Sequence, residues 1–266
     1  MKITLKGDVR EFDAPKTALE IASSLSQALK KEALAVKIDG EVAGLTTVID
    51  RDCALEFLTF ADEEGRRVYR HTASHVLAQA VKALFPQAKL AIGPAIENGF
   101  YYDFDCDTAF STEDFKKIEK EMERIIKANY PIVRSEKPRA EAIAFMREKG
   151  EPYKVELIED LPEDAVISFY TQGDFTDLCA GPHLPSTGYV KAVKIMSVAG
   201  AYWRGSEKNK MLQRLYATAF PKKADLDAYV QQLEEAKKRD HRKLGKELEL
   251  FDIFDEGPGF PAFLPN

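Results

Sequence analysis

The sequence predicts an α+β protein made of a small N-terminal domain, a larger second domain and a final helix. Two observations indicate this class. Short segments that alternate apolar and polar residues, as strands do, are interspersed with longer segments whose apolar residues recur at helical spacing. The 266 residues also exceed the length of one ordinary domain, about 100–200 residues. We therefore expect domains at 1–62 and 63–223, a linker helix at 224–250, and the beginning of another domain at 251–266.

The composition is that of a globular protein and excludes two other classes. Hydrophobic residues make up 45% of the chain and charged residues 31%, which is too much apolar material for an intrinsically disordered chain. No run of about 18 apolar residues occurs, so we expect no membrane span. The first residues lack the apolar core of a signal peptide, and three cysteines do not make a disulfide framework. These observations predict a cytoplasmic location.

The first 60 residues have the pattern of a small domain of strands with one helix. Segments 3–5 and 9–12 flank turn-forming residues and predict a β-hairpin. Thr17 followed by Glu20 matches a capping box and predicts the start of a helix. This helix carries Leu19, Ile21, Ala22, Leu25 and Leu29, and further strands are expected at 35–38, 45–49 and 54–60. The order of these elements resembles the ubiquitin-like β-grasp fold of TGS domains, and the alternative is an unrelated small α+β domain.

The larger domain alternates helices and strands. Apolar residues at helical spacing predict helices at 66–85, 111–129 and 139–149, and a last helix at 223–248. Residues 92–104 combine turn-forming residues with an aromatic strand, and further strands are expected at 153–157, 166–170 and 190–198.

Three of the four histidines fall in two short motifs of the same spacing. His71 and His75 stand four residues apart on a predicted helix, and Cys179 and His183 repeat that spacing. Three nitrogens and one sulfur suit either a tetrahedral zinc site or a metal-free pocket that holds a water. The alternative for His71 and His75 is a pair of hydrogen-bonded core histidines. At about 100° per residue, however, they lie roughly opposite the apolar stripe of their helix, which favours a cleft or solvent.

A resemblance to a known family rests on these motifs and their neighbours. HTASH at 71–75 together with DLCAGPH at 177–183 resembles the editing domain shared by threonyl- and alanyl-tRNA synthetases. Segments 92–104, 200–205 and 211–220 resemble threonyl-tRNA synthetases in particular. So does the order of the domains, because alanyl enzymes carry the editing domain after their catalytic core. The resemblance extends over essentially all 266 residues.

The resemblance implies hydrolysis of seryl-tRNA(Thr), a mischarged product with serine on the tRNA for threonine. Serine lacks only one methyl group of threonine, and such a difference allows only about 10–200-fold discrimination at one site. A second site that hydrolyses the ester at the terminal adenosine supplies the remainder. By motif match, His71 positions or activates the water, and Lys154 stabilises charge or relays a proton. For Lys154 the alternative is a solvated strand lysine.

The resemblance also implies the substrate-binding residues. Asp177 is expected to hold the α-amino group of the substrate, with a turn aspartate as the alternative. His75, Cys179 and His183 are expected to contact the amino acid or the terminal adenosine. We expect this site to work without metal, although alanyl-type editing domains resemble it with zinc bound. The zinc ligands would then be His71, His75, Cys179 and His183.

Residues 257–266 resemble the entry to a class II catalytic core. The full-length parent is therefore expected to ligate threonine to tRNA(Thr) with ATP, and to hold magnesium and a catalytic zinc in the core missing here. The fragment itself is expected not to aminoacylate tRNA and to be a monomer, whereas the parent is expected to be a homodimer.

The last predicted helix carries a run of basic residues. The net charge of −6 argues against indiscriminate coating of nucleic acid but allows a local basic contact. We expect contact with the acceptor stem of the tRNA, and the alternative is a solvated helix face. An alanyl-tRNA-type trans-editing deacylase and a non-catalytic tRNA-binding module are the alternative functions. The expected tRNA-binding residues are Lys237, Lys238, Arg239, Arg242, Lys243 and Lys246.

Overall fold

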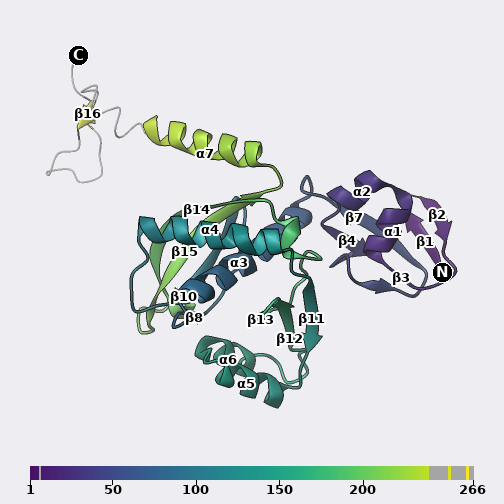
Figure 1. Ribbon diagram of the computed structural model, residues 1–266, viewed down its shortest axis with the longest axis horizontal. Coiled ribbons are helices and arrows are strands. Elements are labelled where there is room, and N and C mark those ends of the chain that lie inside the picture. Colours follow the sequence, from purple (N-terminus) through teal and green to yellow (C-terminus); the bar gives the residue numbers. More distant parts are fainter. Residues whose placement is uncertain (6, 240–250, 253–261, 264–266) are drawn as a thin grey trace. The chain divides into compact units, whose positions relative to one another are not determined.

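The computed structural model confirms the mixed α+β class (Figure 1). The chain divides into two compact units, 1–221 and 222–266. The residues that the structure describes are 1–5, 7–239, 251–252 and 262–263.

The N-terminal part of the first unit is a five-stranded sheet with two short helices. Strand β1 pairs antiparallel with β2 and parallel with β7, and the sheet order is β2-β1-β7-β4-β5. Ile21 of α1 is fully buried in one hydrophobic cluster with Ile3 and Val36 of the sheet. The elements are β1 (Lys2–Leu5), β2 (Asp8–Glu11), β3 (Lys16–Thr17), α1 (Ala18–Leu25), α2 (Gln27–Glu32), β4 (Ala35–Ile38), β5 (Glu41–Ala43), β6 (Val48–Ile49) and β7 (Cys53–Leu58).

The capping box predicted at the start of the first helix is confirmed. The Thr17 hydroxyl accepts a hydrogen bond from the Glu20 N–H at 3.2 Å, and the Glu20 carboxylate accepts one from the Thr17 N–H at 2.7 Å. The single helix expected to continue through Leu29 is wrong, because Ser26 divides it. The backbone of Ser26 is extended, and its side chain caps the second helix by accepting from the Leu29 N–H at 3.0 Å.

The strand expected at 45–49 is also wrong for most of its length. Asp39 and Gly40 both have positive φ, so the chain turns back at once and β5 pairs directly with β4. Only Val48–Ile49 of the expected segment forms a strand, paired with β3.

The rest of the first unit is built around α3 and a second sheet. This sheet has the order β14-β15-β10-β8, with β9 paired to β10. Val76 and Leu77 of α3 are fully buried in one hydrophobic cluster with Phe100 and Leu215 of the sheet. Figure 1 shows α3 and α4 together against this sheet. The elements are α3 (Glu63–Leu84), β8 (Lys89–Leu90), β9 (Ala95–Ile96), β10 (Gly99–Asp105), α4 (Thr112–Ala128), β14 (Ala192–Tyr202) and β15 (Met211–Phe220).

A smaller sheet and two helices complete the first unit. The sheet has the order β11-β12-β13 and is antiparallel throughout. Met146 of α5 and Ile158 of α6 are buried in one hydrophobic cluster with Phe169 of the sheet. The elements are β11 (Ile132–Glu136), α5 (Arg139–Glu148), α6 (Pro152–Glu159), β12 (Ser168–Gln172) and β13 (Phe175–Leu178).

The strand expected at 153–157 is wrong, because this segment lies inside α6. A short apolar run does not distinguish a strand from a buried helix by its periodicity. Pro152 stands in the first turn, where its missing N–H costs no helical hydrogen bond. Val155 and Ile158, three residues apart, then face the same hydrophobic cluster. Lys154, a candidate site residue, therefore lies on a helix and not on a strand.

The second unit contains α7 (Lys223–Lys238) and a short antiparallel pair, β16 (Phe251–Asp252) with β17 (Ala262–Phe263). The expected helix continued to residue 248, and the segment 240–250 lies outside the described residues. Among the helices that the structure describes, none has the length and apolar character needed to cross a membrane.

Candidate functional site

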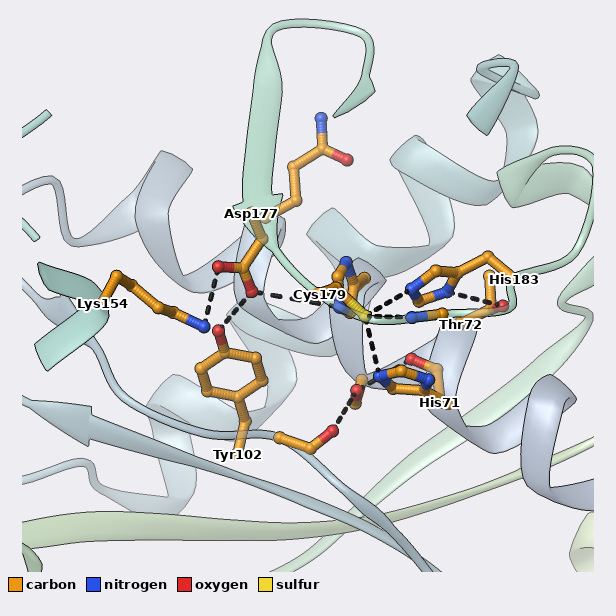
Figure 2. Close-up of polar contacts among 12 residues, drawn as sticks. His71, Thr72, Tyr102, Lys154, Asp177, Cys179 and His183 are labelled. Carbon is orange, nitrogen blue, oxygen red and sulfur yellow. Dashed lines mark hydrogen bonds and ion pairs between the residues drawn. The ribbon is translucent and has the colours of Figure 1, made fainter. Parts of the chain in front are cut away.

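The structure brings together the four side chains of the histidine–cysteine motifs. His71 and His75 come from α3, and Cys179 and His183 come from the segment that follows β13. One donor atom from each of these residues lies within 4.8 Å of the others. The Cys179 Sγ atom lies 3.3 Å from His71 Nε2 and 3.2 Å from His183 Nε2 (Figure 2).

The backbone around Cys179 fixes the position of its sulfur. The Cys179 N–H donates to the Ser168 carbonyl at 3.1 Å, and the Ser168 hydroxyl donates to the Cys179 carbonyl at 2.6 Å. Gly181 donates its N–H to Cys179 Sγ at 3.2 Å. Gly181 has a φ of +74°, and a Cβ there would lie 2.0 Å from the Tyr170 hydroxyl. A side chain at this position would therefore displace the segment that carries the thiol.

Thr72 orients His183 and is a site residue that the sequence did not indicate. Its hydroxyl donates to the Val68 carbonyl at 3.0 Å and accepts from the Leu184 N–H at 3.0 Å. His183 Nδ1 lies 3.1 Å from the same oxygen. Because the hydroxyl has one proton, already donated to Val68, the bond to His183 requires a proton on Nδ1. His183 Nε2 is then the unprotonated nitrogen that faces Cys179.

A buried ion pair lies beside this cluster. Lys154 Nζ of α6 lies 2.7 Å from Asp177 Oδ1 of β13, and the two side chains are 4% and 2% exposed. The Tyr102 hydroxyl of β10 donates to Asp177 Oδ2 at 2.6 Å, and His75 Nε2 lies 3.9 Å from that same oxygen. Figure 2 shows Lys154 and Tyr102 on the same carboxylate. Asp177 therefore connects the ion pair to the histidines.

Tyr102 is the second site residue that sequence reasoning missed. It lies in the aromatic strand that the sequence predicted within 92–104, and its ring packs in the core while its hydroxyl reaches Asp177. Burial, and then the negative charge of Asp177, raise the pKa of the Tyr102 phenol well above its usual 10. The phenol is therefore a hydrogen-bond donor at neutral pH.

Burial keeps the histidine–cysteine cluster uncharged. It lowers the pKa of His71 to about 4 and holds the pKa values of His75 and His183 well below 6.5. It also raises the pKa of the Cys179 thiol to about 12. At neutral pH the cluster thus consists of three neutral imidazoles and a neutral thiol, each able to accept a hydrogen bond.

These groups line a cavity of about 610 Å³. Its wall includes His71, His75 and Arg67 from α3, Lys154 from α6, and Asp177 and Cys179 from β13 and the segment after it. The histidines face this cavity, in agreement with the cleft that the helical angles predicted. His71 is partly exposed there, whereas His75 is only 3% exposed.

The donor set fits a tetrahedral zinc ion in its chemistry. Three imidazole nitrogens and one sulfur are the ligand types of structural zinc sites, and all four lie close together. The Nδ1 atom of His75 is buried and makes no hydrogen bond to the residues that the structure describes. Both of these observations are also compatible with a metal-free pocket, so the expected absence of metal stays a prediction.

The basic residues expected to bind tRNA belong to the second unit. Lys237, Lys238 and Arg239 are exposed at the end of α7. The other three, Arg242, Lys243 and Lys246, lie outside the described residues.

Comparison with known proteins agrees with the motifs. Residues 1–59 match the TGS domain family, and residues 167–216 match the family described as the threonyl and alanyl tRNA synthetase second additional domain. The chain is 65% identical to a threonine–tRNA ligase of Acetivibrio thermocellus, over all of this chain and 42% of the relative. Threonine–tRNA ligases of Clostridium acetobutylicum and Clostridium tetani are each 64% identical over the same shares. The chain carries the TGS and second additional domains of threonyl-tRNA synthetases.

The residues of the candidate site lie partly inside and partly outside the segment that matches the second additional domain. Asp177, Cys179 and His183 lie within the segment that matches the second additional domain, whereas His71 and Lys154 lie before it. The chain spans 42% of the length of the relatives that it matches. The domain boundaries expected at residues 62 and 223 stay predictions, since the family matches cover only parts of these ranges.

Proposed function

We propose that this chain hydrolyses the ester bond between serine and the terminal adenosine of tRNA(Thr). The observation that carries the proposal is the cavity in which neutral His71 and the buried pair of Lys154 and Asp177 meet. The similarity to threonine–tRNA ligases supports the choice of tRNA. A synthetase for threonine needs such a reaction, because the missing methyl of serine allows only about 10–200-fold discrimination at one site.

His71 is suited to accept a hydrogen bond from the attacking water. Its imidazole is neutral because its pKa is lowered to about 4, mainly by burial. A neutral imidazole has one unprotonated nitrogen that can position a water or take its proton. His71 also lies in the wall of the cavity and is the most exposed histidine of the cluster. We therefore propose that His71 positions the attacking water or takes its proton.

Lys154 supplies the positive charge. As water adds to the ester carbonyl, negative charge develops on the carbonyl oxygen, and a fixed cation in a water-poor site stabilises it. The ammonium of Lys154 is 2.7 Å from Asp177 and also lies 5.4 Å from the centre of the Tyr102 ring. These contacts hold the cation in one place before the substrate arrives.

Asp177 is assigned to the α-amino group of the substrate. Its Oδ2 already accepts from Tyr102, and its Oδ1 forms the ion pair with Lys154. A carboxylate has about four acceptor positions, so a substrate ammonium can join these donors without displacing them. Three cationic or polar donors on one carboxylate would then place the ester carbonyl beside Lys154.

His75, Cys179 and His183 are assigned to the walls of the substrate site. His75 and Cys179 line the cavity, and His183 contacts Cys179 and is fixed by Thr72. We propose that the reaction uses these groups without metal. If zinc binds, His71, His75, Cys179 and His183 would hold it, and it would supply Lewis-acid chemistry at the ester.

The remaining proposals concern the longer protein and its partner. We propose that tRNA(Thr) contacts Lys237, Lys238 and Arg239, and that Arg242, Lys243 and Lys246 continue this contact. The relatives are named threonine–tRNA ligases, so a full-length counterpart would join threonine to tRNA(Thr) with ATP in a separate catalytic core. This core would hold magnesium and a catalytic zinc and form the homodimer, whereas the 266-residue chain would be monomeric and cytoplasmic.

One assay tests the function directly. The chain is incubated with seryl-tRNA(Thr), threonyl-tRNA(Thr) and seryl-tRNA(Ala), and release of the amino acid is followed. We expect rapid hydrolysis of seryl-tRNA(Thr), slow hydrolysis of threonyl-tRNA(Thr), and loss of activity in His71→Ala and Lys154→Ala. A preference for the tRNA(Ala) acceptor would indicate an alanyl-type deacylase. Binding of tRNA without hydrolysis would indicate a non-catalytic module.

A further inference from the structure

A second cavity, of about 470 Å³, adjoins the proposed ester site. Three arginines of α3, Arg66, Arg67 and Arg70, line it together with the segment 95–97. The two cavities share Arg67 and Ala95 as wall residues, so they are neighbours. A molecule that extends from the first cavity into the second therefore passes Arg67.

The spacing of residues along α3 places an arginine of this cavity in line with the histidines of the proposed ester site. Arg67, His71 and His75 follow one another at intervals of four residues, which places them in one row along α3. Arg66 and Arg70 form a neighbouring row at the same interval. Arg67 thus continues the histidine row one helical turn toward the N-terminus of α3, with Arg66 and Arg70 beside it.

Backbone carbonyls orient the guanidinium group of Arg66. Its Nη1 donates to the Ala61 carbonyl at 2.6 Å and to the Phe60 carbonyl at 3.3 Å. These acceptors are uncharged, so they hold the group without neutralising it. Within the part of the chain that the structure describes, neither Arg66 nor Arg67 forms an ion pair, although the carboxylate-bearing residues Glu63 and Glu97 also line the cavity.

The other two arginines differ in exposure. Arg70 is 6% exposed, and its guanidinium donates to the backbone carbonyl of Glu97. Arg67 is exposed and lines both cavities. Arg67, His71 and His75 line the same cavity, so a ligand that occupies it lies beside all three side chains.

We propose that Arg67, supported by Arg66 and Arg70, binds the 5′-phosphate of the nucleoside whose ester is hydrolysed in the adjoining cavity. Guanidinium groups present planar, paired N–H donors that match phosphate oxygens. The phosphate that links the last two nucleotides of an RNA strand is one sugar away from the 3′-ester. The identity of the nucleoside rests on the proposed function. The location of the phosphate site rests on the geometry of the two cavities.

The test compares adenosine with adenosine 5′-monophosphate as ligands of the 266-residue chain, by titration calorimetry at low salt. The two probes differ only in the phosphate. We expect the wild-type chain to bind the monophosphate about tenfold more tightly than adenosine, in proportion to one charge-assisted contact. Arg67→Gln should abolish this preference, whereas Arg67→Lys, which keeps the positive charge, should retain part of it. Equal affinities of the wild-type chain for the two probes, or an undiminished preference in Arg67→Gln, would overturn the proposal.

A matched control distinguishes phosphate binding at this site from a general effect of positive charge on the protein. Arg10 is an exposed arginine on β2, and Arg10→Gln removes the same charge outside both cavities. This variant should keep the full preference for the monophosphate, and a loss equal to that of Arg67→Gln would overturn the site. Because the titration requires no turnover, a failure of seryl-tRNA hydrolysis with the preference intact would refute the function alone. Hydrolysis without the preference would refute the phosphate site alone.

Discussion

The hydroxyl of Thr72 lies 3.1 Å from Nδ1 of His183, although the two residues are 111 positions apart in the chain. The same oxygen accepts the N–H of Leu184 and donates to Val68 within α3. One buried side chain therefore attaches the segment after β13 to the helix that carries His71. The arrangement of the site depends on this attachment, and it leads to the first prediction.

Thr72→Val should lower both stability and deacylation. Valine has the shape of threonine but leaves the N–H groups of Leu184 and His183 without their acceptor, which costs about 1–3 kcal/mol each when a buried group loses its partner. Urea unfolding should show a loss of about 2–6 kcal/mol for the two groups together, and hydrolysis of seryl-tRNA(Thr) should fall by about tenfold. Thr72→Ser keeps the hydroxyl and serves as the control. If Thr72→Val retained wild-type hydrolysis, Thr72 would have no role in positioning the site.

Lys154→Met should destabilise the fold as well as abolish hydrolysis. It leaves the carboxylate of Asp177 buried without its cation, and breaking a buried pair in this way costs about 3–5 kcal/mol. Adding Asp177→Asn should restore part of the stability, because the uncompensated charge is gone, but not the activity. Chemical denaturation of the two variants measures the difference.

An exposed pair provides the matched control for Lys154. Lys127 and Glu123 lie 3.9 Å apart on α4, with side chains 80% and 61% exposed. Lys127→Met should change stability by no more than about 1 kcal/mol, as usual for surface pairs. Equal effects of Lys127→Met and Lys154→Met would show that the Lys154–Asp177 pair is not buried in solution.

As the pH falls, the fold should lose stability before His71 becomes protonated in the folded chain. Burial lowers the pKa of His71 from its usual 6.5 to about 4, so between these values the unfolded chain binds a proton that the folded chain does not. Stability therefore falls as the pH drops from 6.5 toward 4, and His71→Ala should flatten this dependence. For hydrolysis of seryl-adenosine, kcat should stay constant from pH 7 to about pH 5. An acid limb centred at 6.5 would contradict a neutral, buried His71.

Metal analysis should distinguish the metal-free site from a zinc site. We expect the purified chain to contain less than stoichiometric zinc and to keep its deacylation activity in a chelator. Because burial raises the pKa of the Cys179 thiol to about 12, iodoacetamide at pH 8 should modify Cys179 only slowly. Stoichiometric zinc that is lost in Cys179→Ala would overturn the metal-free site, since zinc binds the thiolate.

Parts of the fold followed from local sequence signals. The capping box at Thr17 and Glu20 is observed as predicted, and so are the helix expected at 111–129 and the hairpin of β1 and β2. These elements have signals within a few residues, namely capping side chains, turn residues and a clear apolar period. The segment 153–157 had only a short apolar run, and its helix α6 was missed because packing against Met146 and Phe169 decides its conformation.

The sequence by itself indicated the four residues of the histidine–cysteine cluster, because the motifs at 71–75 and 177–183 contain its three histidines and its cysteine. It also placed His71 and His75 on one helix face, which follows from helical geometry alone. Only the tertiary structure decided that Lys154 and Tyr102 meet on Asp177, that Thr72 holds His183, and that Arg67 lines two cavities. Contacts of this kind join elements far apart in the chain, and no local periodicity records them.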